Sequence, residues 1–253
     1  MGWPLEPVDR ARFAEAFGSV AYWQSDEPVA SYWYDRQLEE WRAIGDRREI
    51  ANALFNRAYA DMISIMLGIA DTTDLAAGRA RLEEAMAISK ELGDRGGEGN
   101  ALWGLGSYYY FTADAAGAQP WYERSLELHR EAGDRTMEAW SLHMIALTAM
   151  SQRHFDEGMD KARHAMRHFY EAGDIAGVIL TLDDVSIISL AQGDTERAGR
   201  LWGAARALQA ATGTDLADSV DQTQRLYGTP TEGRAPARGA GPAVRRGRRH
   251  EPR

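Results

Sequence analysis

The 253-residue sequence contains no cysteine. Disulfides, thiolate nucleophiles and cysteine-ligated metal or iron–sulfur sites are therefore excluded. No apolar run approaches the roughly 20 residues that a membrane-spanning helix requires. Met1 to Arg12 also lack the basic and then apolar order of a secretory signal. We therefore expect a cytoplasmic protein with no membrane partner.

Lysine is nearly absent, since only Lys90 and Lys161 occur beside 27 arginines. The formal net charge is −9, but it is unevenly distributed. Residues 228–253 hold seven arginines and two acidic residues, a net charge of +5, which leaves −14 for residues 1–227. So acidic a body repels phosphate backbones, and we expect it not to bind nucleic acid.

A Gly-Asp dipeptide recurs along the chain, starting at residues 45, 93, 133 and 173, so the steps are 48, 40 and 40 residues. Such a period is typical of stacked supersecondary units. We expect each glycine to end a helix in the left-handed region and each aspartate to cap the next helix. Asp156 and Asp194 are expected to cap helices within a repeat in the same way.

The repeat fits a helix–turn–helix template. Its clearest copy places Leu102, Leu105, Gly106 and Tyr109 on one helix face, followed by Ala118, Tyr122 and Ser125. This copy resembles the tetratricopeptide (TPR) signature, and five copies share the pattern. The predicted fold is an all-α, TPR-like right-handed α-solenoid of about five repeats. Because the period is 40 rather than 34, we expect a longer second helix.

Two features of the second copy break the pattern. An insertion falls near Met66 to Leu75, as a loop or a helix extension. Arg57 and Asp61 occupy positions that are usually apolar. Either they form a buried polar link, or the register slips beside the insertion, and the insertion favours the slip.

The chain also resembles a specific group of proteins. The repeat ends "ELGDR" and "EAGDR", the segment Gly18–Asp26 and the segment Gly193–Gly213 are similar to the C-terminal TPR region of bacterial signal-transduction ATPases, including LuxR-type regulators. The resemblance implies a sensor arm that receives an inducer or a partner protein. No phosphate-binding loop motif and no recognisable helix-turn-helix DNA reader occur here, which implies either a stand-alone sensor or a fragment.

The expected domain organisation has three parts. The solenoid covers residues 8–216, and residues 217–227 form a helical or loop extension. Residues 228–253 are rich in Arg, Gly, Ala and Pro and lack Leu, Ile, Phe and Met. A segment of this composition cannot bury a core, so a disordered tail is expected.

In TPR arrays the first helix of each repeat lines the concave face, which predicts the groove residues. The candidates are Asn52, Phe55, Asn56, Tyr59, Asn100, Trp103, Ser107, Tyr110, Trp140, His143, Met144, Asp183 and Asp184. Asparagine amides can clamp the backbone of an extended peptide, and aromatic rings can cover apolar side chains. The alternative is that aromatics such as Phe55 and Tyr110 pack inside a tightly wound superhelix.

Nothing in the sequence indicates catalysis, a cofactor or a resident metal. Asp160, His164 and His168 have a spacing that can hold a divalent cation, but surface histidines among arginines are commoner. We therefore expect a non-catalytic interaction module, which binds a peptide, a partner protein or a small effector in bacterial signalling or transcriptional regulation. The alternative is a structural protein that self-associates through its N-terminal repeat, which carries Tyr22, Trp23, Trp33 and Trp41.

Overall fold

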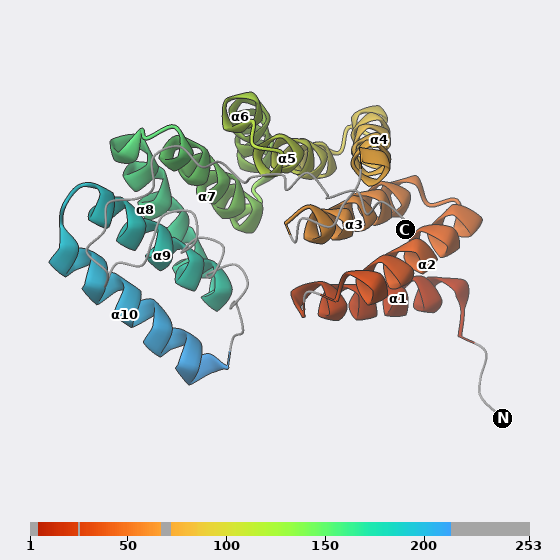
Figure 1. Ribbon diagram of the computed structural model, residues 1–253. Coiled ribbons are helices and arrows are strands. Elements are labelled where there is room, and N and C mark those ends of the chain that lie inside the picture. Colours follow the sequence, from red (N-terminus) through yellow and green to blue (C-terminus); the bar gives the residue numbers. More distant parts are fainter. Residues whose placement is uncertain (1–4, 25, 67–71, 214–253) are drawn as a thin grey trace, which may run out of the picture.

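The computed structural model describes residues 5–24, 26–66 and 72–213, and within them the only regular structure is helical (Figure 1). The helices of this described part are α1 (Pro7–Trp23), α2 (Glu27–Ile44), α3 (Arg47–Met66), α4 (Thr72–Glu91), α5 (Arg95–Phe111), α6 (Ala115–Ala132), α7 (Arg135–Ser151), α8 (Phe155–Ala172), α9 (Ile175–Ala191) and α10 (Thr195–Thr212). The predicted extension and tail, residues 217–253, lie outside the described residues, so the predicted domain limits stay predictions.

The helices form two layers of an arc. Each helix packs on the next along the chain, and the first helices of successive pairs also contact one another, α1 with α3, α3 with α5, α5 with α7 and α7 with α9. No two successive second helices make such contacts within the described residues. The first helices therefore form the inner layer and the second helices the outer layer, as Figure 1 shows for α3 and α4.

The Gly-Asp pairs have the predicted capping role. Gly133 ends α6 with φ of 72°, and the carboxylate of Asp134 accepts a hydrogen bond from the backbone N–H of Met137 at 3.0 Å. The glycines at 45, 93 and 173 share the left-handed conformation, and each following aspartate accepts an equivalent bond. These bonds satisfy backbone donors that a helix start leaves free.

The two predicted caps within repeats have different outcomes. Asp194 caps α10, because its carboxylate accepts from the backbone N–H of Arg197 at 3.0 Å. The prediction for Asp156 is wrong. α8 already begins at Phe155, so Asp156 lies inside the first turn and instead accepts from Nε2 of Gln192 at 2.8 Å.

The expectation of a longer second helix is also wrong. α5 has 17 residues and α6 has 18, and the pairs α7–α8 and α9–α10 have the same lengths. The extra residues of the 40-residue period are thus shared between both helices, because two antiparallel helices bury most surface when their lengths match. In the second repeat α3 and α4 each reach 20 residues, which places the insertion as helix extensions on both sides of residues 67–71.

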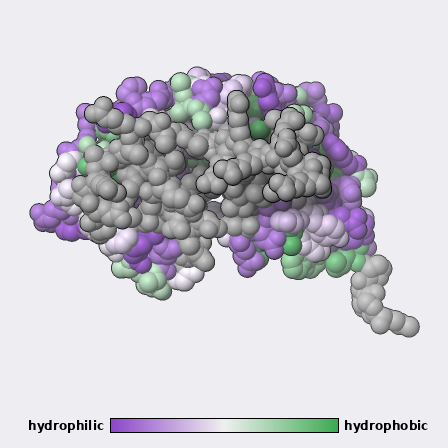
Figure 2. All heavy atoms as spheres, viewed as in Figure 1, coloured by the Kyte–Doolittle hydropathy of each residue, from purple (hydrophilic) through white to green (hydrophobic). Residues whose placement is uncertain are grey.

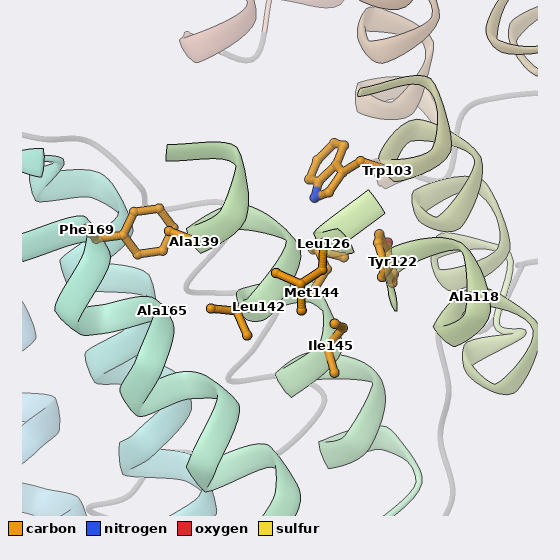
Figure 3. Packing of buried hydrophobic residues seen from close by; sticks show 10 residues of the cluster. All are labelled: Trp103, Ala118, Tyr122, Leu126, Ala139, Leu142, Met144, Ile145, Ala165 and Phe169. Carbon is orange, nitrogen blue, oxygen red and sulfur yellow. The ribbon is translucent and has the colours of Figure 1, made fainter. Parts of the chain in front are cut away.

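Close approach between the layers depends on a small residue in α5. A Cβ atom added at Gly106 would lie 2.9 Å from the ring of Tyr122 in α6. Tyr122 is fully buried and donates a hydrogen bond to Oγ of Ser107 at 3.1 Å. The hydrophobic cluster around it extends through α5 to α8 and includes Leu126 and Met144, which lie close together in Figure 3. The core thus runs continuously from one repeat to the next.

Arg57 and Asp61 form a buried polar link, so the expectation of a register slip is wrong. Without a slip, Leu54 corresponds to the buried Leu102 of the clearest copy, and Leu54 is indeed fully buried. Arg57 pairs with Asp61 and, at 2.8 Å, with Asp35 of α2, while Arg81 of α4 pairs with Asp61 at 2.7 Å. Burial raises the pKa of Asp61 despite these two arginines. The link joins three helices, which no spacing within α3 could indicate.

Candidate functional site

All the candidate groove residues lie on inner helices. α3 carries Asn52, Phe55, Asn56 and Tyr59; α5 carries Asn100, Trp103, Ser107 and Tyr110; α7 carries Trp140, His143 and Met144; and α9 carries Asp183 and Asp184. The solenoid therefore brings residues from four separate repeats to one side of the arc. Their role in binding stays a prediction.

Burial divides these residues into two sets. The buried members are Trp103, Ser107, His143, Met144, Asp183 and Asp184, and the partly exposed members are Asn52, Phe55, Asn56, Tyr59, Asn100, Tyr110 and Trp140. Ser107 and Met144 belong to the core, where Ser107 donates to the carbonyl of Trp103 at 3.0 Å. The alternative of packing inside the superhelix applies more to Trp103, which is 4% exposed, than to Phe55 or Tyr110.

Aromatic rings connect the inner helices of the first three repeats. The ring of Tyr59 lies 4.6 Å from Tyr22 of α1, 5.8 Å from Phe55 and 5.2 Å from Trp103 of α5, measured between centroids. We call these four residues the aromatic ladder. Burial raises the pKa of the Tyr59 hydroxyl to about 12, so it stays protonated at neutral pH. The ladder is an uncharged strip with three partly exposed rings and the buried ring of Trp103, and the rings hold one another in place.

The three candidate asparagines differ in the hydrogen bonds that their side chains already make. Nδ2 of Asn52 donates to Glu49 at 3.2 Å, and Nδ2 of Asn56 donates to Gln37 of α2 at 3.2 Å. Oδ1 of Asn100 has no hydrogen-bond partner among the described residues. Buried polar atoms are normally hydrogen-bonded, so an unmatched acceptor on the inner layer is a candidate contact for a ligand.

Charged groups replace the rings in the last two repeats. Nδ1 of His143 lies 2.8 Å from Oδ2 of Asp184, and Asp183 pairs with Arg206 of α10. Burial outweighs the attraction of Arg206 and raises the pKa of Asp183 to about 6. The ring of Trp140 lies 5.7 Å from that of His143, at the partly exposed side of the pair. This end of the inner layer combines buried carboxylates with an aromatic ring.

Arg206 was not predicted for this site, and Tyr22 was predicted for the N-terminal self-association surface instead of the groove. Arg206 belongs to a second helix, and the inner-face template considers only first helices, so no spacing indicates its pairing with Asp183. Tyr22 does occupy an inner-face position of the template, and its stacking on Tyr59 depends on contact between α1 and α3. The repeat template alone could have found Tyr22 but not Arg206.

The described residues contain no group of three or more His, Asp or Glu side chains that could hold a metal ion. His164 lies 3.6 Å from Asp160, while His168 lies 4.0 Å from Glu138 of α7. The two histidines thus face different carboxylates rather than one shared centre. In the described part of the chain, no helix has the length and apolar character needed to cross a membrane.

The sequence matches no protein-family model and no curated protein. Its fold does match solved structures. A Rap protein complexed with competence and sporulation factor aligns with a TM-score of 0.71 and 15% identity, over 88% of this chain and 59% of that one. Aspartyl phosphate phosphatase F from Bacillus subtilis aligns with a TM-score of 0.64 and 13% identity, over 89% and 58%.

A putative kinesin light chain with TPR-like repeats from Podospora anserina aligns with a TM-score of 0.54 and 13% identity, over 82% of this chain and 96% of that one. This chain spans less than three fifths of the length of the Rap protein and of the phosphatase. At these identities the likeness concerns the fold. The part of the chain that the structure describes is thus a TPR-like right-handed α-solenoid of five helical pairs, as predicted from the sequence, with a 40-residue period and one 48-residue step.

Proposed function

We propose that this chain is a non-catalytic interaction module that binds an extended peptide segment of a partner protein along its inner layer. The observation that carries the proposal is a row of equivalent, partly exposed residues on successive inner helices, Asn52, Asn100 and Trp140. Packed helices lie about 8–10 Å apart, and an extended chain advances about 3.3 Å per residue. Each repeat would therefore meet roughly every third residue of a bound peptide.

The inner layer also holds three polar atoms that are buried and lack a hydrogen-bond partner among the described residues. Oδ1 of Asn100 and Oδ1 of Asp183 are acceptors, and Nε1 of Trp103 is a donor; none has a hydrogen-bond partner among the described residues. A peptide backbone offers both N–H donors and C=O acceptors along its length. All three atoms are buried, so a peptide meets first the partly exposed residues of the layer, which carry the proposal.

The charge of the site favours a basic side chain at one end of the peptide. Asp183 and Asp184 lie buried on α9 of the fifth repeat, and the ring of Trp140 on α7 can hold a cation against its face. The body carries an acidic excess of −14, which attracts cationic partners over a longer range. We therefore expect selected peptides to be basic toward the α7–α9 end.

The comparisons and the sequence resemblance support a regulatory role for this binding. The Rap protein that shares the fold was solved in complex with competence and sporulation factor. The repeat ends resemble the sensor arms of bacterial signal-transduction ATPases. We propose that the chain acts as a cytoplasmic sensor that passes peptide or partner binding to a regulator.

Peptide selection on the purified chain tests the proposal. Peptides from a random display library would be selected and their affinities measured by fluorescence anisotropy. We expect Asn100→Ala and Trp140→Ala each to weaken binding about tenfold, which equals about 1.4 kcal/mol. Tyr170→Ala is the matched control, because Tyr170 is an exposed aromatic on the outer helix α8. Peptides that bind the two inner-layer variants as tightly as the wild type would refute the proposal.

Self-association is a second candidate function. It is favoured by one specific observation, the large apolar side chains that the N-terminal helix pair leaves exposed. This function does not compete with peptide binding, because the exposed side chains differ from the inner-layer candidates.

A further inference from the structure

Helix α1 carries a stripe of exposed apolar side chains. Phe13, Phe17 and Val20 are 50%, 52% and 57% exposed, and their i, i+4, i+7 spacing puts them on one helix face. We call these three residues the α1 stripe. Figure 2 shows hydrophobic residues gathered at the lower right of the molecule, where α1 lies in Figure 1. Contiguous exposed apolar surface of this kind marks an interaction site.

Trp23 of α1 and Tyr32 of α2 extend the exposed surface, at 55% and 56% exposure. The other aromatics expected there contribute little. Trp41 is buried against α3, and Tyr22 stacks on Tyr59. Trp33 is partly buried, and its ring lies 5.0 Å from that of Phe17 in a stacked arrangement. The Phe17 ring is therefore held in place before any partner arrives, which lowers the entropic cost of binding.

In the later repeats, the first-helix face that corresponds to the α1 stripe is covered by the preceding repeat. The residues that correspond to Phe13 in later repeats are Ala53, Ala101, Ser141 and Thr181, and all four are fully buried. Oγ of Ser141 lies 3.1 Å from Oγ of Ser125 in α6, the second helix of the preceding repeat. Every later repeat thus buries this face against its predecessor, while in α1 the same face is exposed.

The size of Phe13 argues against a further repeat as the missing partner. At each internal junction the corresponding residue is Ala, Ser or Thr, which allows the preceding helix to approach closely. A phenylalanine ring at that position would prevent a helix from packing at the same distance, because interaxial distance depends on the side chains at the contact. The α1 stripe therefore suits a helix that packs with a different spacing.

Charge and symmetry indicate what that helix is. Between Phe13 and Trp23 the only charged residue is Glu15, and Glu15 is half-buried and turned toward Asn56 of α3. Two copies of the stripe could meet without charge repulsion, although the rest of the body is acidic. If they lie antiparallel about a point between Ala16 and Phe17, Phe13 of one copy faces Val20 of the other.

We infer that the α1 stripe is a two-fold interface between two copies of this chain. Closed two-fold dimers are the commonest homo-oligomers, and their interfaces are self-complementary in the way this stripe is. The interface leaves the inner layer of both copies free. The inference rests on self-association, the second candidate function, and names its surface and symmetry; it is independent of the proposed peptide binding.

Molar mass in solution tests the interface directly. Sedimentation equilibrium over a range from low to high micromolar concentration should show a monomer–dimer equilibrium for the wild type. Phe17→Glu should weaken dimerisation at least about 100-fold, because it buries a charge from each copy on the two-fold axis. Tyr170→Glu, at an exposed aromatic of α8, should dimerise as the wild type does. A wild type that is monomeric throughout, or a Phe17→Glu variant that dimerises normally, would overturn the inference.

Crosslinking gives a second readout that does not depend on the Glu variants folding. Because the chain has no cysteine, Ala16→Cys places a single thiol beside the proposed axis, and Ala16 is exposed. Mild oxidation should give a disulfide-linked dimer of Ala16→Cys and much less of the control Tyr170→Cys, since a disulfide needs Cα atoms within about 7 Å. Equal crosslinking of both variants would count against the interface. Asn100→Ala should dimerise normally, so a failure of the peptide proposal is distinguishable from a failure of the α1 interface.

Discussion

The inner layer has two halves built on the same scaffold but with different chemistry. Phe55 and Trp103 occupy equivalent positions of the first helices in the second and third repeats, where rings stack between helices. The same position holds His143 and Asp183 in the fourth and fifth repeats, where charged groups pair. The repeat therefore determines where a side chain lies. The residue type at that position determines whether the side chain stacks on a ring or pairs with a charged group.

The difference has consequences for conditions and for ligands. Ring stacking depends little on pH, whereas the Asp183–Arg206 pair responds to protonation of Asp183, whose pKa is about 6. A bound peptide would accordingly meet an uncharged strip at one end and an acidic, pH-dependent site at the other. The variants below test this contrast by changing equivalent positions in the two halves.

The largest expected effect comes from Trp103→Ala. Trp103 packs against both the aromatic ladder and Tyr122 of the core, so its removal should lower the free energy of unfolding by about 3–5 kcal/mol. Phe55→Ala, at the same template position but partly exposed, should cost no more than about 2 kcal/mol. Urea unfolding followed by circular dichroism measures both. Equal losses would show that burial does not separate the two positions.

Asp184→Ala tests the charged half. His143 would lose the carboxylate 2.8 Å from its Nδ1 and remain buried, which should cost about 2 kcal/mol. Asn56→Ala is the matched change in the aromatic half, because Asn56 holds the same template position and is partly exposed. We expect it to cost less than about 1 kcal/mol in the same urea experiment. An Asp184→Ala loss no larger than that of Asn56→Ala would contradict the assigned role of the pair.

Asp183 makes the charged half pH-dependent. Its pKa is about 6 in the folded chain, above the ordinary value of 3.8, because burial disfavours the carboxylate. A raised folded pKa contributes stability fully below pH 4, and that contribution is lost as the pH rises through 6.

Asp183→Asn should remove this dependence. Relative to the wild type, the variant should gain about 1–2 kcal/mol of stability at pH 7 and lose that advantage toward pH 4. Thermal or urea unfolding at several pH values measures the difference. A difference between variant and wild type that stays constant from pH 4 to pH 7 would contradict the pKa assignment.

The smallest expected effect tests the scaffold that both halves share. The turn between first and second helices has a left-handed residue at Ala113, Arg153 and Gly193, with φ of 70°, 65° and 88°. Ala113→Gly should stabilise the chain by up to about 1 kcal/mol, and Gly193→Ala should destabilise it by a similar amount. Arg153 is less suitable, because its guanidinium lies over the ring of Phe155. Differential scanning calorimetry measures the change in unfolding temperature. A rise for Ala113→Gly and a fall for Gly193→Ala would confirm that the two turns are equivalent.

Local features of the fold were predictable from the sequence. The Gly-Asp pairs and the apolar spacing of each copy act within a few residues, so the pattern along the chain indicates them directly. Asp156 shows the limit of this approach. Asp156 lies five residues after the end of α7 and was expected to cap α8, yet α8 begins at Phe155 and its N-cap is His154.

Contacts between helices were less predictable. Arg57 and Asp61 are satisfied by Asp35 and Arg81, which come from the helices on either side. In the same way, Trp103 is buried and Phe55 is half-buried at one template position, because Trp103 packs on Tyr122 within the core cluster of α5 to α8. Such differences depend on neighbours that are distant in sequence.

The sequence by itself determined the all-α repeat architecture and the Gly-Asp helix caps, because these follow from short-range backbone preferences and a regular period. Only the tertiary structure decided which inner-face residues are buried, which charges pair, and that the α1 stripe is exposed. Burial and pairing depend on what the adjacent repeat presents, and α1 differs from the later first helices in lacking a preceding repeat among the described residues.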